Sequence, residues 1–215
     1  MRHHSYPLSP IPYEQLTIEN ICGYESPPAC YWAPRRREIQ RFVEIACSVR
    51  DKKGKPTIID VGCGTGLLAY LLARTEQVKV IGLDPDKRVL EETHYRHANL
   101  QLLVGDADDA VRLYRHQEIA MVINSWMPMG MNLTPALRRI RAKSIAYVLE
   151  SGGATGDEDR SYEPGRQYYD AFSWRGPSLS EVQIIAIRHL SKLDGNRNEI
   201  RIQLRKDIPR PMLPS

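Results

Sequence analysis

Residues 57–74 read TIIDVGCGTGLLAYLLAR, a β-branched run followed by alternating glycines and then by strong helix formers. This order predicts a buried strand, a tight loop and the beginning of a helix. Gly62, Gly64 and Gly66 stand where a side chain would obstruct a ligand or would have to adopt a positive φ. A glycine loop that leads into a helix lets a ligand approach the backbone, so we expect a ligand at this position.

Patterns typical of strands and helices alternate after this loop. Further strands are predicted at residues 78–83, 100–104, 119–123 and 144–149. Helices are predicted at residues 85–97, 108–115 and 134–142. Because strands that alternate with helices through short loops imply βαβ units, we expect a doubly wound α/β fold whose mostly parallel sheet is covered on both faces.

The pattern changes after residue 150. Residues 151–165 contain four glycines and an acidic cluster, which predicts a loop. A short helix is predicted at residues 168–174, and strands are predicted at residues 182–190 and 198–205. Asp194-Gly195-Asn196 lies between these strands and is a hairpin signal, so the parallel sheet is expected to end in an antiparallel hairpin.

The first 34 residues are interrupted by six prolines. Each proline removes an amide donor and disfavours helix in the residue before it, so only short elements are expected there, the best helix candidate being residues 13–21. Residues 35–46 predict an amphipathic helix, because four apolar residues follow the spacing of one helix face. These four residues are Ile39, Phe42, Val43 and Ala46.

Composition is typical of a globular protein. The chain has 215 residues, of which 42% are hydrophobic and 26% are charged. Its net charge of +4 comes from 30 basic and 26 acidic residues that are interspersed, which gives little indication of a nucleic-acid partner. No apolar run approaches the ~18 residues of a membrane span, and residues 1–7 do not resemble a secretory signal. We therefore expect a cytoplasmic protein without a membrane partner.

No metal site is predicted. The four cysteines, at positions 22, 30, 47 and 63, form no C-x-x-C pair and no spacing typical of metal ligands, so reduced thiols are expected. His94 and His97 would share one face of a predicted helix, but no third ligand lies near them in the sequence.

A dinucleotide is the first candidate ligand for the glycine loop. Its G-x-G-x-x-G fingerprint, started at Gly62, would place the third glycine at position 67. That position is Leu67, and the glycine comes one residue earlier, at Gly66. Since the third glycine controls how closely helix and strand pack, an NAD(P)-dependent oxidoreductase is disfavoured and is kept as an alternative.

The sequence at residues 60–66, DVGCGTG, resembles the D-x-G-x-G-x-G loop of class I S-adenosylmethionine-dependent methyltransferases. The resemblance runs from about residue 57 to residue 149, and the predicted hairpin extends it to about residue 206. It implies a Rossmann-like, seven-stranded sheet whose last strand is antiparallel, with S-adenosyl-L-methionine as the cofactor. The methyltransferase domain would occupy residues 51–208, between an N-terminal cap or helical extension at 1–50 and a tail at 209–215.

Three acids at strand ends support this resemblance. Asp84 ends the second predicted strand, where a carboxylate can accept both ribose hydroxyls of an adenosine. The resemblance implies a contact with adenine for Asp106, and a contact with the cationic amino end of the methionine portion for Asp60. Asp84 and Asp106 have a second interpretation, because an acid before a helix is often only a cap or a helix-dipole partner. The set predicted to bind the cofactor is Asp60, Gly62, Cys63, Gly64, Thr65, Gly66, Asp84, Pro85, Asp106, Ala107, Asn124 and Ser125.

Asn124, Ser125 and Trp126 follow the fourth predicted strand at the edge where such folds bind ligands. The resemblance implies that this stretch faces the methyl group and the acceptor, so Asn124 and Trp126 are the candidates for acceptor contact. Alternatively, Trp126 could be a residue of the hydrophobic core and have no contact with the acceptor. Residues 124–128 read NSWMP and depart from the N-P-P-Y type of motif, which disfavours adenine in DNA and glutamine side chains as acceptors.

A small molecule is the favoured acceptor, and nucleic-acid and protein acceptors stay open. Residues 1–50 and the loop 151–165 lie where such enzymes build a substrate cap. The aromatic candidates for its walls, each of which could instead pack in a small core, are Tyr24, Tyr31, Trp32, Tyr162, Tyr168 and Trp174. A non-catalytic partner subunit that binds S-adenosylmethionine or S-adenosylhomocysteine is the second interpretation of the whole chain.

Overall fold

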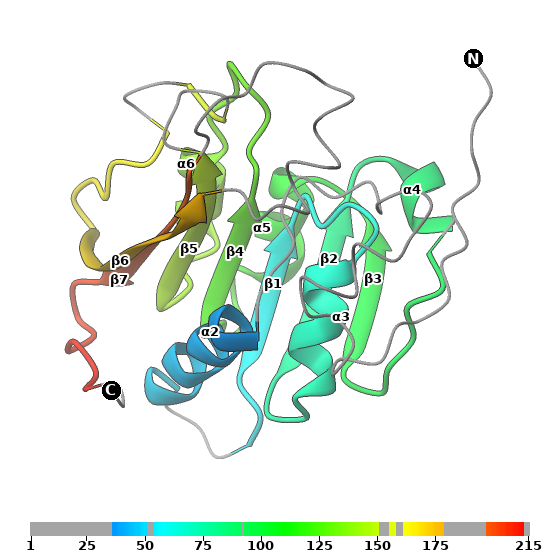
Figure 1. Cartoon of the computed structure of the whole chain (residues 1–215), viewed down its shortest axis with the longest axis horizontal. Coiled ribbons are helices and arrows are strands. Elements are labelled where there is room, and N and C mark those ends of the chain that lie inside the picture. Colours follow the sequence, from blue (N-terminus) through cyan, green and yellow to red (C-terminus); the bar gives the residue numbers. More distant parts are fainter. Residues whose placement is uncertain are drawn as a thin grey trace.

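A single seven-stranded sheet runs through the described part of the protein (Figure 1). The computed structural model describes residues 36–50, 54–91, 93–150, 155–157, 161–178 and 197–212. The strands are β1 (Thr57–Val61), β2 (Lys79–Asp84), β3 (Leu100–Val104), β4 (Met121–Ser125), β5 (Ser144–Glu150), β6 (Tyr168–Ser178) and β7 (Arg197–Arg205). Their order in the sheet is β3-β2-β1-β4-β5-β7-β6.

Strands β1 to β5 are parallel, and β7 and β6 are antiparallel at one side. β1 pairs with β2 and β4, and β3 and β5 pair with the outer sides of these two strands. β7 runs antiparallel to β5, and β6 runs antiparallel to β7. The predicted fold class, a mostly parallel sheet that ends in antiparallel C-terminal strands, is confirmed.

The strand order reverses next to β1. From β1 the chain adds β2 and β3 on one side and then crosses to β4 and β5 on the other. In sheets of this kind, ligands bind at the carboxyl ends of the strands on either side of the reversal. The ends of β1 and β4 are therefore the place where a ligand is expected.

Helices cover both faces of the sheet. They are α2 (Arg36–Ser48), α3 (Leu67–Arg74), α4 (Lys87–Glu91), α5 (Ala107–Tyr114) and α6 (Thr134–Arg139). α2 and α3 lie over one face, and α5 and α6 lie over the other (Figure 1). Successive residues of β1 point to opposite cores, as in any strand: Ile58 packs with α2 and α3, whereas Ile59 packs with α5 and α6.

The helix predicted at residues 35–46 is confirmed as α2. The four apolar residues that predicted it are all buried. Every residue from Leu67 to Ala73 of α3 is buried as well, because α3 contacts α2 on one side and the sheet on the other. The proposed domain boundaries, which divide the chain into residues 1–50, 51–208 and 209–215, stay predictions.

The helix predicted at residues 85–97 is wrong beyond its beginning. α4 has five residues, and residues 93–98 follow an irregular path. Tyr95 is buried and stacks on Tyr70 of α3, with ring centroids 4.8 Å apart. The Arg96 guanidinium donates to the Tyr95 carbonyl at 2.8 Å, which gives that carbonyl a partner outside any helix. A tertiary aromatic contact thus overrides a weak local preference for helix.

The helix predicted at residues 168–174 is also wrong, because these residues belong to β6. They pair with β7 in antiparallel register, so a contact that is distant in sequence decides their conformation. The remaining predicted elements of the parallel part are confirmed to within about three residues at either end. The predicted helix at 13–21, the strand at 182–190 and the turn at 194–196 lie outside the described residues.

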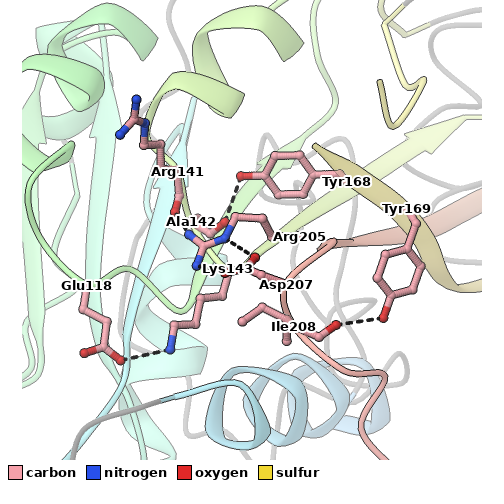
Figure 2. A network of polar contacts seen from close by, with 9 residues as sticks. All are labelled: Glu118, Arg141, Ala142, Lys143, Tyr168, Tyr169, Arg205, Asp207 and Ile208. Carbon is pink, nitrogen blue, oxygen red and sulfur yellow. Dashed lines mark hydrogen bonds and ion pairs between the residues drawn. The ribbon is translucent and has the colours of Figure 1, made fainter. Parts of the chain in front are cut away.

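A polar network connects residues at the amino-terminal ends of the parallel strands, which we call the amino edge of the sheet (Figure 2). Lys143, just before β5, pairs with Glu118 at 3.4 Å. Arg205 at the end of β7 donates to the Arg141 carbonyl at 2.7 Å and pairs with Asp207 at 2.6 Å. The end of β7 is thereby attached to the beginning of β5, on the side of the sheet opposite the glycine loop.

Candidate functional site

The glycine loop connects the end of β1 to the beginning of α3. The N–H groups of Gly62 and Cys63 both donate to the Leu83 carbonyl, at 2.8 and 3.0 Å, and the Gly66 N–H donates to the Cys63 carbonyl at 2.9 Å. Gly66 has a φ of 81°, and a Cβ added to it would lie 3.0 Å from the Leu102 side chain. The positive φ therefore favours glycine at this position, and any larger residue would also displace the Leu102 side chain.

Asp84 braces this loop from the end of β2. Its Oδ2 accepts the Gly64 N–H at 2.8 Å, and its Oδ1 accepts the Asp86 N–H at 2.9 Å. Each carboxylate oxygen keeps a further acceptor position. Asp84 can therefore hold the loop and still accept hydroxyl groups from a ligand. This bracing role could not be predicted from the spacing of the residues.

Asp60 is a buried carboxylate beside the loop. It is 1% exposed, and neither of its oxygens accepts a hydrogen bond within the described part of the chain. Burial, and to a smaller extent the nearby Asp84 carboxylate, raise the pKa of Asp60 from 3.8 to about 7. A buried carboxylate without a donor is costly, and a cationic or hydrogen-bonding ligand would complete its surroundings.

The Cys63 thiol lies against the same two acids. Burial and the carboxylates of Asp60 and Asp84 raise its pKa well above the usual value for a thiol. Because the thiolate is the nucleophile, this neutral thiol is unsuited to covalent catalysis. A Cβ added to Gly82 would lie 2.9 Å from the Cys63 sulfur, so the thiol fills space that the glycine of β2 leaves. Cys63 is a packing residue of the loop.

Asn124 joins the end of β4 to the end of β1. It is buried, and its Nδ2 donates to the Val61 carbonyl at 2.8 Å. Its Oδ1 and the neighbouring Ser125 hydroxyl have no hydrogen-bond partner among the described residues. Both side chains therefore keep hydrogen-bonding capacity next to the glycine loop.

Trp126 follows β4 with a left-handed backbone, at a φ of 56°. Its N–H donates to the Val148 carbonyl of β5 at 2.8 Å, and its half-buried ring packs against the core under α2 and α3. A positive φ is uncommon for a residue other than glycine, and such residues gather at functional sites. Sequence reasoning could not find this conformation, because no local motif encodes it. The core contact is observed, and the contact with an acceptor stays a prediction.

Asp106 caps α5. Its Oδ1 accepts the Asp109 N–H at 2.9 Å, and Asp109 Oδ2 accepts the Asp106 N–H at 3.2 Å, which together form a capping box. The structural interpretation of Asp106 is therefore confirmed. Ala107 is buried against the sheet and Pro85 is exposed beyond β2. The contact of Asp106 with adenine stays a prediction, and so do the contacts of Ala107 and Pro85 with the cofactor.

Hydrogen bonds connect the carboxyl ends of β1, β2, β3 and β4, which together form the carboxyl edge of the sheet. Asn124 links β4 to β1, the loop amides link β1 to the Leu83 carbonyl of β2, and the Gly105 N–H beyond β3 donates to the Asp84 carbonyl at 3.0 Å. The sequence-predicted site residues therefore lie at the carboxyl ends of these strands or in the segments that follow them. Sequence reasoning missed the Leu83 carbonyl and the Leu102 side chain, because they shape the loop from other strands.

No metal site is found among the described residues, where no three His, Cys, Asp or Glu side chains gather in a way that could hold an ion. His94 is exposed, and Nδ1 of His97 accepts the Asn99 N–H at 3.2 Å. The described helices also include none with the length and apolar character needed to cross a membrane.

Comparison with known proteins shows a matching domain model and structures of similar fold. A family model described as a methyltransferase domain matches residues 58–153, from β1 to just beyond β5. The seven-stranded sheet with antiparallel C-terminal strands is the fold of class I methyltransferases. The chain therefore has the fold of class I methyltransferases, and its residues 58–153 match a methyltransferase domain. No curated protein matches the chain in sequence.

Solved structures share this fold at low sequence identity. Geranyl diphosphate methyltransferase in complex with S-adenosylmethionine is 12% identical over 96% of this chain and 99% of its own, with a TM-score of 0.54. An rRNA methylase from Streptococcus thermophilus is 14% identical over 80% of this chain and 99% of its own, with a TM-score of 0.53. The chain spans 45% of the length of a protein from an antibiotic biosynthesis pathway of Anabaena variabilis, which is 18% identical over 54% of this chain with a TM-score of 0.42. At these identities the likeness concerns the fold.

Proposed function

We propose that the protein is an S-adenosyl-L-methionine-dependent methyltransferase. The observation that carries this proposal is the buried, unpartnered carboxylate of Asp60 beside the glycine loop of a methyltransferase domain. A cation is the natural complement of such a carboxylate, and S-adenosyl-L-methionine carries an ammonium group on its methionine portion. The free acceptor atoms at this edge therefore fit the cofactor.

Different strand ends would hold different parts of the cofactor. Asp84 would accept the ribose hydroxyls with the acceptor positions that the two backbone N–H groups leave. Asp106 would accept the exocyclic amine of adenine, and Asp60 would pair with the ammonium group. The full proposed set is Asp60, Gly62, Cys63, Gly64, Thr65, Gly66, Asp84, Pro85, Asp106, Ala107, Asn124 and Ser125.

The contribution of the chain to methyl transfer would be positioning. When bound, the cofactor supplies an electrophilic methyl group on a sulfonium. Asn124 and Trp126, at the end of β4, would orient the acceptor in line with that methyl group and exclude water. A general base is needed only for an acceptor that must lose a proton first, so the site does not require a catalytic dyad.

A small molecule is the acceptor that we propose. Residues 124–128 lack the N-P-P-Y type of motif, and the charges of the chain are nearly balanced. The similar structures are named for different acceptors, geranyl diphosphate in one and rRNA in the other. RNA is therefore the second acceptor class to be tested. The cytoplasmic location stays a prediction.

Two alternatives predict different binding results. A non-catalytic subunit would bind S-adenosylmethionine or S-adenosylhomocysteine without turnover. An NAD(P)-dependent oxidoreductase would bind a nicotinamide dinucleotide, but Leu67 occupies the position of the third glycine and packs into the core.

Calorimetry with S-adenosylmethionine, S-adenosylhomocysteine and NAD tests the cofactor. We expect the two adenosyl ligands to bind and NAD not to bind. Tight binding of NAD with no response to S-adenosylmethionine would contradict the proposal. Incubation with methyl-labelled donor and separate pools of small molecules and total RNA then tests the acceptor. Label in the small-molecule pool supports it, label in RNA alone contradicts the acceptor class, and binding without transfer favours the partner-subunit alternative.

A further inference from the structure

Asp60 lies where neighbouring strands offer it no hydrogen-bond donor. In the sheet it is in register with Gly82 of β2 and Ile123 of β4. The glycine has no side chain, and the isoleucine side chain is apolar. The Nδ2 of Asn124 donates to the Val61 carbonyl at 2.8 Å, and neither Asp60 oxygen accepts a hydrogen bond from it. The carboxylate is therefore buried among groups that do not stabilise its charge.

The charged and titratable groups around Asp60 oppose its ionisation. Asp84 faces it from the end of β2, and its negative charge raises the pKa of Asp60. The Cys63 thiol faces it from the glycine loop and stays neutral, because its own pKa is raised. No lysine, arginine or histidine of the described part forms an ion pair with Asp60. Burial and Asp84 together raise the pKa of Asp60 to about 7.

From this arrangement we infer that Asp60 selects ligands by charge and couples their binding to the release of a proton. In the empty site the carboxyl group holds a proton in a large share of the molecules. When the ammonium of an adenosyl amino acid enters, it becomes the counter-ion, and the proton leaves the carboxyl oxygen for the solvent. No covalent bond to carbon forms or breaks. The inference rests on the proposed function, since it names what Asp60 does toward the cofactor of that site.

Affinity for an ammonium-bearing ligand should then depend on pH in a defined direction. Below the midpoint the ligand must displace a proton, so binding weakens by about tenfold from roughly pH 8 to roughly pH 6. A ligand that lacks the amino-acid portion has no cation to offer. 5′-Methylthioadenosine is such a ligand, and its binding should be insensitive to pH over the same range.

Calorimetry of S-adenosylhomocysteine binding near pH 7, in two buffers of different ionisation enthalpy, counts the protons released. We expect about half a proton per ligand for the wild type. We expect none with 5′-methylthioadenosine, and none with the Asp60→Asn variant, whose amide cannot titrate. Wild-type binding without proton release, or equal release by Asp60→Asn, would overturn the inference.

Carbon-13 NMR of the Asp60 carboxyl group in the ligand-free protein gives a second readout that does not depend on the cofactor. We expect a titration midpoint near 7, identified by its absence in Asp60→Asn. A midpoint below about 5 with normal ligand binding would overturn this inference and leave the proposed function intact. Absence of S-adenosylhomocysteine binding would overturn both, so the two failures are distinguishable.

Discussion

The two edges of the sheet differ in whether a buried ionisable side chain has a partner. At the amino edge the Lys143 side chain is 4% exposed and is paired with Glu118 at 3.4 Å (Figure 2). At the carboxyl edge Asp60 is as deeply buried and has no ion pair or hydrogen bond within the described residues. Burying an ionised group without a partner costs much more free energy than leaving it exposed to water. A buried acid without a partner is therefore expected where a ligand supplies that partner. The difference indicates a structural role for the amino edge and a binding role for the carboxyl edge.

Asp60→Asn should give the largest effect, because it removes the unpaired acid. The pKa of Asp60 is about 7 in the folded chain, against ~3.9 for an unfolded aspartate. Between these values the folded state holds a proton that the unfolded state has lost, so the free energy of unfolding decreases as the pH rises and levels off above about 7. From about pH 5 to about pH 8, the wild type should lose about 2–3 kcal/mol relative to Asp60→Asn.

Urea denaturation of both proteins without ligand, at several pH values in this range, measures that difference. Subtracting one protein from the other removes the contributions of groups that titrate in both. A wild-type minus variant difference that stays constant with pH would mean that Asp60 is ionised and partnered in the folded protein. The contrast between the two edges would then disappear.

Glu118→Gln tests the amino edge, where it leaves the buried Lys143 ammonium without its acid. Because Glu118 is partly exposed and Asp207 also lies near Lys143, we expect a destabilisation of about 1–2 kcal/mol, below the range for a fully buried pair. The matched control is Asp108→Asn, which breaks a pair with Arg139 in which both side chains are largely exposed. That control should change the free energy of unfolding by less than about 0.5 kcal/mol. Equal effects in urea denaturation would contradict a structural role for the Lys143 pair.

Asp84→Asn should weaken S-adenosylhomocysteine binding by about tenfold, as calorimetry measures it. Asparagine has one acceptor oxygen, which cannot hold the Gly64 N–H, the Asp86 N–H and two ribose hydroxyls together. The control is Asp86→Asn, which removes the same charge two residues away, from a carboxylate that bonds Arg88 at the surface. We expect the control to bind within about twofold of the wild type. Equal losses in both variants would show that net charge, and not the bracing of the loop, matters.

The glycine loop could be predicted from the sequence because its signal is local. Residues 60–66 contain the acid, the glycines and their spacing, and the hydrophobic strands around them are typical of a parallel sheet. The sequence could not predict that Asp60 lacks a hydrogen-bond partner. This depends on the residue beside it in the neighbouring strand, which is Gly82 and has no side chain. The early end of α4 depends on the stacking of Tyr70 and Tyr95, which the sequence separates by a whole strand. Tertiary contacts thus decided what local patterns left open.

Asp106 gives the smallest expected effect and the sharpest test of its two interpretations. Asp106→Ala removes the cap of α5 and should lower the free energy of unfolding by about 1 kcal/mol. Asp106→Asn keeps an oxygen that can accept the Asp109 N–H, so its stability should stay within about 0.5 kcal/mol of the wild type. The amide nitrogen that replaces Oδ2 is a donor, so it cannot accept the amine of adenine. If calorimetry finds weaker S-adenosylhomocysteine binding in this stable variant, Asp106 contacts the ligand; if affinity is unchanged, Asp106 is a cap alone and the adenine assignment is wrong.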